Sequence, residues 1–198
     1  MNVGGKGSIA VDGKEFTFAK RDCLYIGRGS KQIEFSSANT QEPAWFYLIS
    51  YPAHATHPTR LATATEAATV ELGAPRDANQ RTIYKYIHKD GIQSCQLVMG
   101  FTELKEGSIW NTMPPHTHSR RTEVYLYFDV APDAAVFHMM GAAQQTRHMI
   151  VRNGEAVLSP PWSIHCGAGT RRYSFIWAMG GENQEFTDMD QIAVKDLK

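Results

Sequence analysis

Residues 111–127, NTMPPHTHSRRTEVYLY, carry the most informative pattern in this chain. His116 and His118 are two residues apart, so on a β-strand both imidazoles project from the same face and can share one metal ion. Glu123 follows a short polar stretch that lets the chain turn, and it opens an apolar run, so its carboxylate can return to the same interior. His165 supplies a fourth candidate ligand at the end of the later stretch PPWSIH. Three imidazoles and one carboxylate suit a divalent Zn, Fe, Mn, Ni or Co ion.

The sequence on both sides of this pattern consists of short β-prone runs separated by turn signals, with few windows of helical period. It therefore predicts an all-β protein. Asp12-Gly13 and Asn153-Gly154 each lie between two such runs, and both dipeptides are typical of tight hairpin turns. A similar glycine-rich pattern follows each predicted hairpin, starting at Gly27 and at Gly167. We interpret this similarity as an internal repeat of one β-unit.

The repeat predicts two β-domains. Residues 1–52 are expected to form a partial N-terminal domain without metal ligands, and residues 81–198 a C-terminal metal-binding domain. Residues 53–80, rich in Ala, Thr and Pro, are expected to be a linker. Tyr25 occupies the position of His165 in the first copy of the repeat, which is why no metal is expected there. The first copy is expected to lack front strands, which would leave an open sheet edge, so either the chain is truncated or a partner covers that edge.

Composition narrows the class of protein. The 198 residues contain 20 Lys and Arg and 20 Asp and Glu, and this balance argues against a nucleic-acid partner. The longest apolar stretch, residues 44–49, is far shorter than the ~20 residues that a membrane span needs, and the N-terminus lacks the pattern of a signal peptide. Three cysteines without CxxC spacing imply neither a disulfide framework nor a zinc ribbon. We expect a cytoplasmic protein without a membrane partner.

The ligand pattern, His-x-His-x4-Glu followed by Pro-x-x-x-x-His, resembles the two sequence motifs of the cupins, double-stranded β-helix barrels that hold a metal inside. Longer runs are more specific: WNTMP at 110–114, VFHMMG at 136–141, WSIH at 162–165 and the tail at 180–190. On these runs the chain resembles the family of 5-keto-4-deoxyuronate isomerases. Members of that family carry an additional N-terminal stretch, in agreement with the missing front strands.

The resemblance implies a bicupin with an incomplete N-terminal barrel and a homo-oligomeric assembly. It implies one divalent metal ion per chain, Zn²⁺, held by His116, His118, Glu123 and His165. The implied reaction is the ketol isomerisation of 5-dehydro-4-deoxy-D-glucuronate to 3-deoxy-D-glycero-2,5-hexodiulosonate in pectin and uronate degradation. The enzyme would then be an intramolecular oxidoreductase of the aldose-ketose type.

Such a reaction needs three kinds of group. A metal ion can stabilise the enediol oxyanion as a Lewis acid. A cationic side chain should bind the substrate carboxylate, and Arg121, Arg147 and Arg172 are the candidates. The proton could be moved by Glu123 or by a metal-bound hydroxide, and the sequence leaves this choice open.

Two other functions remain compatible with the pattern. The same four ligands suit iron, so an iron-dependent cupin oxygenase is one alternative. A non-catalytic sugar-binding cupin is the other. His138 and His148 have no partner at a suitable spacing, so structural or surface roles are expected for them.

Overall fold

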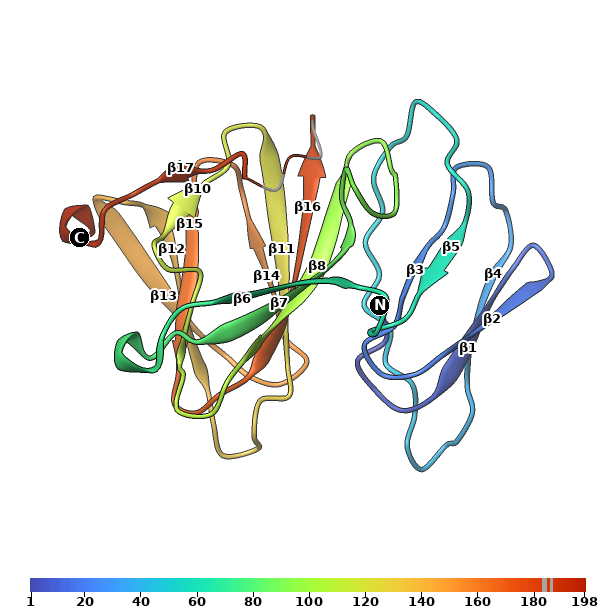
Figure 1. Cartoon of the computed structure of the whole chain (residues 1–198), viewed down its shortest axis with the longest axis horizontal. Helices are drawn as coiled ribbons and strands as arrows, with labels where there is room; N and C mark the ends of the chain where they lie inside the picture. Colours follow the sequence, from blue (N-terminus) through green and yellow to red (C-terminus); the bar gives the residue numbers. More distant parts are fainter. Residues whose placement is uncertain (183–184, 186) are drawn as a thin grey trace.

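The computed structural model describes residues 1–182, 185 and 187–198. Asn183, Gln184 and Phe186, which belong to the tail at 180–190, lie outside the described residues. The described chain is all β, as predicted: it contains two short 3-10 helices, η1 (Pro75–Asp77) and η2 (Val194–Asp196), and no α-helix. Figure 1 shows a barrel of strands on the left and a smaller group of strands on the right. In the described residues, no helix has the length and apolar character needed to cross a membrane.

The barrel is built from two main antiparallel sheets. The larger has the order β14-β11-β16-β8-β7-β6 and comprises β6 (Ala68–Leu72), β7 (Arg81–Ile87), β8 (Leu97–Leu104), β11 (Arg121–Phe128), β14 (Ala156–Ser159) and β16 (Ser174–Gly181). The smaller has the order β13-β12-β15-β9 and comprises β9 (Trp110–Asn111), β12 (Val136–Ala142), β13 (Gln145–Val151) and β15 (Ile164–Gly169). A short pair, β10 (His116–Thr117) with β17 (Asp190–Gln191), lies at the upper end of the barrel (Figure 1).

The N-terminal strands form two further small sheets. One has the order β2-β1-β4, with β1 (Gly7–Val11), β2 (Lys14–Phe18) and β4 (Ile33–Ser37), and the other pairs β3 (Cys23–Tyr25) with β5 (Arg60–Ala62). The hairpin at Asp12-Gly13 is confirmed, because β1 and β2 pair on either side of it. Both turn residues have positive φ, 49° at Asp12 and 84° at Gly13, as a tight two-residue hairpin turn requires.

The predicted hairpin at Asn153-Gly154 is wrong. The two strands that flank it lie in different sheets, since β13 pairs with β12 and β14 pairs with β11. Gly154 has a positive φ of 80° and Asn153 does not, so the turn lacks the two positive φ angles of the tight hairpin type. A turn dipeptide specifies a local reversal of the chain, and here that reversal carries the chain from one sheet of the barrel to the other.

Residues 53–80, predicted as a linker, contain two strands. β5 pairs with β3 in the N-terminal part, and β6 pairs with β7 at the edge of the larger barrel sheet. The segment therefore crosses between the two parts while adding one strand to each. The division at 52 and 81 stays a prediction.

Strand β16 is buried on both of its faces. Phe175, Trp177 and Met179 point into the barrel and belong to its interior cluster. Ile176 and Ala178 alternate with them and belong to a second cluster on the outer face of the same sheet. The sequence of a strand that is covered on both faces is a nearly continuous apolar run.

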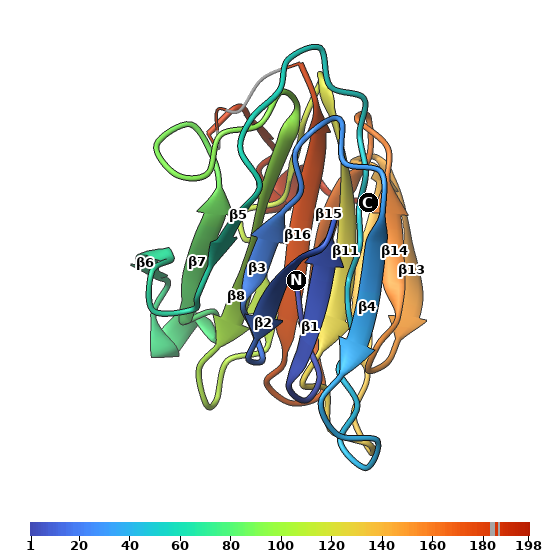
Figure 2. The same ribbon diagram turned by 90° about the vertical axis from the view of Figure 1, so that its right-hand side faces the viewer.

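The second cluster joins the barrel to the N-terminal part. It contains Cys23 and Tyr25 from β3 together with Phe101 from β8 and Phe128 from β11. Figure 2 shows the N-terminal strands lying across the face of the sheet that contains β16 and β11. Arg21 adds polar contacts at this interface. The N-terminal strands therefore cover the larger barrel sheet, whose other face carries the candidate site.

Candidate metal centre and active-site cavity

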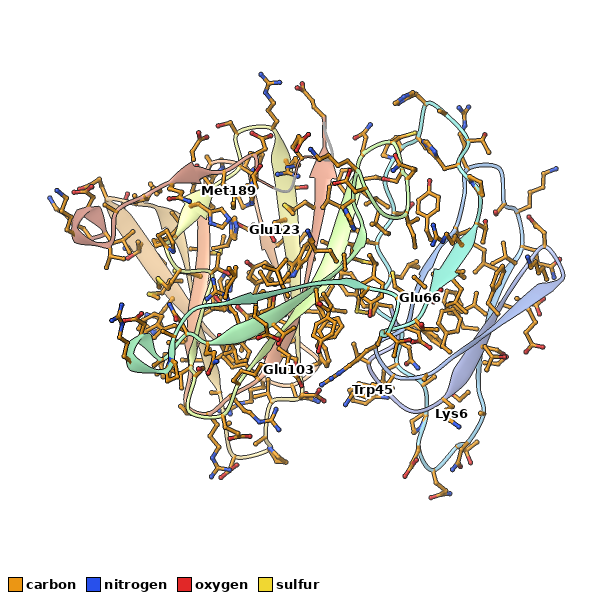
Figure 3. The ribbon with its side chains drawn as sticks, in the orientation of Figure 1. Lys6, Trp45, Glu66, Glu103, Glu123 and Met189 are labelled. Atoms are coloured by element: carbon orange, nitrogen blue, oxygen red, sulfur yellow. The ribbon has the colours of Figure 1, made fainter. Side chains whose placement is uncertain are left out.

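Alternation along β11 turns Glu123 into the barrel. Arg121, Glu123, Tyr125 and Tyr127 are buried, while the residues between them are half-buried. Figure 3 shows Glu123 in the upper half of the barrel, near Met189, and both residues line one cavity.

The three histidines reach the same place from other elements. His116 lies on β10 and His118 directly follows it, while His165 comes from β15 in the smaller sheet. The structure thus brings the four predicted metal ligands together, with one ligand atom from each within 4.8 Å of the others. Apart from His116, which is half-buried, the side chains are almost fully shielded from solvent.

Short distances join the donor atoms of this group. Oε2 of Glu123 lies 2.7 Å from Nε2 of His165 and 3.1 Å from Nε2 of His118. The Nε2 atoms of His165 and His116 are 3.2 Å apart. Despite these approaches, Oε2 of Glu123 is buried without a hydrogen-bond partner among the described residues. An acceptor atom left without a hydrogen and surrounded by ring nitrogens is the arrangement expected of ligands that face a common cation.

The outer ring nitrogens of the histidines support this interpretation. Each Nδ1 lies near an oxygen outside the group: His118 near the Asp188 carbonyl at 2.7 Å, His116 near the Pro114 carbonyl at 3.4 Å and His165 near Ser159 Oγ at 3.4 Å. A carbonyl oxygen only accepts, so His118 and His116 donate from Nδ1 and keep the lone pair on Nε2. That tautomer is the one in which Nε2 binds a metal ion. The residues present therefore fit a divalent ion.

The electrostatics of the group agree with a ligand role. Burial alone would raise the pKa of Glu123, but His165 and His118 beside it outweigh burial and hold that pKa well below its usual range. Burial, with His165 as the next cause, lowers the pKa of His116 to about 4. At neutral pH the carboxylate is therefore ionised and His116 is neutral, which are the forms that bind metals.

Arg121 lies against His118, outside the cavity lining. Its side chain is fully buried, and Nη2 donates to the Asp188 carbonyl over 3.2 Å and lies 3.4 Å from Nδ1 of His118. Arg121 and His118 therefore share one carbonyl, and the arginine holds the segment that orients the ligand. It is absent from the cavity lining in the part of the chain that the structure describes.

The other two candidate arginines lie at the surface. Arg147 is exposed on β13, and its Nη1 donates to the Thr146 carbonyl over 3.0 Å. Arg172 is exposed and pairs with Glu106. Neither is among the described residues that line the cavity.

His138 and His148 lie where structural and surface roles were expected for them. His138 is completely buried on β12, where the Tyr127 hydroxyl lies 2.6 Å from its Nδ1. His148 is exposed on β13. Neither belongs to the group of four.

A cavity of about 210 Å³ opens beside the ligand group. Its lining includes His116, His118 and Glu123, and apolar side chains such as Phe175 and Trp177 make up much of the wall. Such a chamber suits a small ligand held by a few polar groups.

Sequence reasoning missed several polar residues of the cavity, among them Arg81, Thr112 and Tyr125. The Thr112 and Tyr125 hydroxyls lie 2.8 Å apart, and burial raises the pKa of Tyr125 well above its usual value, so Tyr125 keeps its proton. The sequence does contain a signal for Arg81. It shares a strand face with the inward-pointing Ile83, so period-two alternation places a charge inside the barrel.

Comparisons with known proteins agree with this site. The model of the KduI/IolB family matches residues 1–197. The chain is 57% identical over 198 residues to the 4-deoxy-L-threo-5-hexosulose-uronate ketol-isomerase of Shouchella clausii, covering all of this chain and 72% of that protein. It is 54% identical to the enzyme of the same name from Escherichia coli, covering 71% of it.

Solved structures with low sequence identity share the fold. An IolB-like protein from Salmonella typhimurium superposes with a TM-score of 0.69 at 15% identity, covering 96% of this chain and 77% of that one. Oxalate decarboxylase from Bacillus subtilis, a protein with Mn(II) centres, superposes with a TM-score of 0.63 at 10% identity, covering 94% of this chain and 63% of that one. These similarities show that the fold is cupin-like.

Proposed function

The chain belongs to the KduI/IolB family, and from this membership we propose that it is a zinc-dependent ketol isomerase that converts 5-dehydro-4-deoxy-D-glucuronate to 3-deoxy-D-glycero-2,5-hexodiulosonate in uronate degradation. One observation carries the proposal: a buried His-His-Glu-His group beside a small cavity, in a chain 57% identical over its whole length to a ketol-isomerase.

The reaction moves two hydrogens and needs no external oxidant. The substrate has an aldehyde at C1 and a hydroxyl at C2. The proton on C2 leaves as an enediol forms and is then returned to C1, while the hydroxyl proton passes from the C2 oxygen to the C1 oxygen. C1 is reduced from aldehyde to alcohol and C2 is oxidised from alcohol to ketone, so atoms and electrons balance within one molecule.

His116, His118, Glu123 and His165 would hold the zinc ion. When bound there, zinc supplies Lewis-acid stabilisation of the negative charge that develops on the substrate oxygens. The apolar side chains of the cavity exclude water and so strengthen electrostatic interactions inside it. Tyr125, which keeps its proton, can donate a hydrogen bond to a substrate oxygen.

We assign the proton transfer between C2 and C1 to Glu123. It is the sole carboxylate among the described residues that line the cavity. Substitution Glu123→Gln keeps the shape of the side chain and removes the basic oxygen pair, whereas Glu123→Asp keeps the carboxylate and shortens it. We expect deuterium incorporation from D2O into the hydroxymethyl carbon of the product, which was the aldehyde C1 of the substrate, to be lost in the first variant and slowed in the second, with zinc content measured in both. Incorporation at the unsubstituted rate in Glu123→Gln would rule this role out.

The assembly forms a further part of the proposal. We propose that residues 1–52 are an incomplete second cupin barrel and that the protein acts as a cytoplasmic homo-oligomer. β4 is an edge of the β2-β1-β4 sheet and is exposed at all of its positions, which supports association through this sheet. Sedimentation of the purified protein tests the oligomer directly.

The activity is tested by incubating the purified protein with the unsaturated-uronate product of pectin lysis and following the sugar by NMR, with and without a chelator. We expect isomerisation that stops on chelation and returns with Zn²⁺. Elemental analysis and an oxygen electrode accompany the assay. Bound iron with substrate-dependent O2 uptake would contradict the isomerase and favour a cupin oxygenase.

A further inference from the structure

Arg81 is the only lysine or arginine among the described residues that line the cavity. It is the first residue of β7, in the larger barrel sheet. Its side chain is 8% exposed, so the guanidinium is largely withdrawn from water although it borders the cavity. The same cavity is bordered by His116, His118 and Glu123.

The guanidinium of Arg81 is held by backbone oxygens. Nη1 donates to the carbonyl of Asn79 over 2.8 Å, and Nη2 lies 3.4 Å from the carbonyl of Met113. Met113 belongs to the segment that leads into His116, so these contacts set the guanidinium beside the strand that carries a metal ligand. Backbone carbonyls orient the group without neutralising its charge.

No carboxylate of the described chain forms an ion pair with Arg81, and burial is the main cause of the lowering of its pKa. Arg21 provides the contrast. Although it is less buried, its Nη2 lies 2.7 Å from Glu103 and 3.3 Å from Asp129. A buried cation without a counter-ion is costly to the fold, and such charges are normally paired. At Arg81, an anion bound in the cavity can supply the missing counter-charge.

We propose that Arg81 binds the carboxylate of the sugar acid and makes the cavity selective for uronates over neutral sugars. The inference rests on the proposed function for the identity of the substrate. In that substrate the carboxylate is at C6, the opposite end of the carbon chain from the reacting C1 and C2. A cation distinct from the metal ligands on the wall of the same cavity therefore matches a molecule with an anionic end and a reacting end. The guanidinium fork suits a planar carboxylate, and the apolar wall strengthens the charge-assisted hydrogen bonds.

Binding of two stable sugars to the zinc-loaded protein separates this inference from the reaction. D-galacturonate carries a carboxylate and D-galactose does not. We expect calorimetric titration to show galacturonate binding at least about tenfold more tightly than galactose, as a charge-assisted hydrogen bond implies. Arg81→Gln, which keeps an N–H donor for the backbone carbonyls and removes the charge, should abolish the preference. Arg81→Lys, which keeps the charge without the fork, should keep part of it.

A matched control is Arg171→Gln, at an exposed arginine that pairs with Asp133 over 2.7 Å outside the cavity. We expect this variant to keep the full preference for galacturonate. Zinc content measured in every variant shows whether the ligand group is intact. A wild-type protein that binds galacturonate no more tightly than galactose, or an Arg81→Gln variant that keeps the preference, would overturn the inference.

A measurement on the unsubstituted protein keeps the inference testable if the variants do not fold. The Nε–H resonance of Arg81 should shift when galacturonate is added and stay in place with galactose. An unchanged resonance with galacturonate contradicts carboxylate binding.

The proposed isomerase and the role of Arg81 can be refuted independently of each other. Isomerisation with an unchanged KM in Arg81→Gln leaves the isomerase standing and removes the role of Arg81. Selective binding that depends on Arg81, without isomerisation, keeps the role of Arg81 and removes the isomerase.

Discussion

The Nε2 atoms of His116 and His165 lie 3.2 Å apart, although 49 residues separate them in the chain. One residue comes from the short strand β10 and the other from β15 in the smaller barrel sheet. Two ring nitrogens that both carry lone pairs repel each other at this separation unless a proton or a cation lies between them. The folded barrel therefore places the two rings where they can share a proton or a cation.

Removing one ligand should remove the metal. His118→Ala deletes a buried nitrogen donor and leaves Glu123 and His165 facing an open space. We expect zinc content by mass spectrometry to fall below about a tenth of an equivalent, and turnover to fall by a factor of about 100 or more. His148→Ala, at an exposed histidine on β13, is the matched control and should keep both. Full zinc content and activity in His118→Ala would refute the assignment of the ligands.

Arg121 should affect the metal affinity of the site through the Asp188 carbonyl that it shares with His118. Because it shares the Asp188 carbonyl with His118, Arg121→Met frees the segment that orients this ligand. Losses of outer hydrogen bonds around metal ligands weaken binding by about 10–100-fold. We expect a competition titration with a zinc chelator to show a weakening in this range, and Arg121→Lys to recover part of it. An unchanged zinc affinity in Arg121→Met would show that the contact does not orient His118.

The buried His138 should make stability fall in acid. Burial is the main cause that lowers its pKa to about 4, from an unfolded value near 6.5. The unfolded chain therefore binds the proton between these two pH values and the folded protein does not, so the free energy of unfolding decreases as pH falls through this window. The contribution of this group lost between pH 7 and pH 5 is about 2 kcal/mol.

Chemical denaturation of the wild-type protein and of His138→Phe at the two pH values measures that contribution. The variant also loses the contact with the Tyr127 hydroxyl, so it is less stable at pH 7. Its change in stability between pH 7 and pH 5 should nevertheless be smaller by about 2 kcal/mol. Other titrating groups, including His116, are common to both proteins and cancel. Equal changes in the two proteins would exclude His138 as the source.

The outer face of β16 should contribute strongly to stability. Ile176 is completely buried in the cluster between the barrel and the N-terminal strands. Ile176→Ala should lower the free energy of unfolding by about 2–5 kcal/mol, the usual range for deletion of a buried aliphatic side chain. Leu158→Ala, at a residue that is 73% exposed on β14, should change it by less than about 0.5 kcal/mol. Similar losses in the two variants would mean that the cluster does not anchor the N-terminal strands.

The convergence of the candidate metal ligands could be predicted from the sequence because most of their chemistry is concentrated in a short pattern. Alternation places His116 and His118 on the same side of the chain, and Glu123 lies on the next strand, β11. The all-β class followed in the same way from short alternating runs. His165 was a candidate from its place at the end of PPWSIH, and the resemblance to the 5-keto-4-deoxyuronate isomerases supported it as the fourth ligand, although it belongs to the other sheet of the barrel.

Other features depend on pairing between distant strands, which local chemistry does not specify. The turn at Asn153-Gly154 has the composition of a hairpin but joins strands of two different sheets. Arg81 belongs to no motif; alternation along β7 turns it inward, but the cavity that it borders depends on the register in which β7 pairs with β6 and β8. Arg147 and Arg172 are arginines of the same chain whose positions in the barrel leave them at the surface.

The two-sided burial of β16 has a mechanical consequence. The same strand supplies Trp177 and Met179 to the wall of the cavity and Ile176 to the apolar cluster beneath the N-terminal strands. Loss of packing in that cluster would free the backbone that holds the cavity wall, so the N-terminal strands stabilise the shape of the cavity. Heating should therefore melt both parts in one cooperative step, and zinc should be released in that same step.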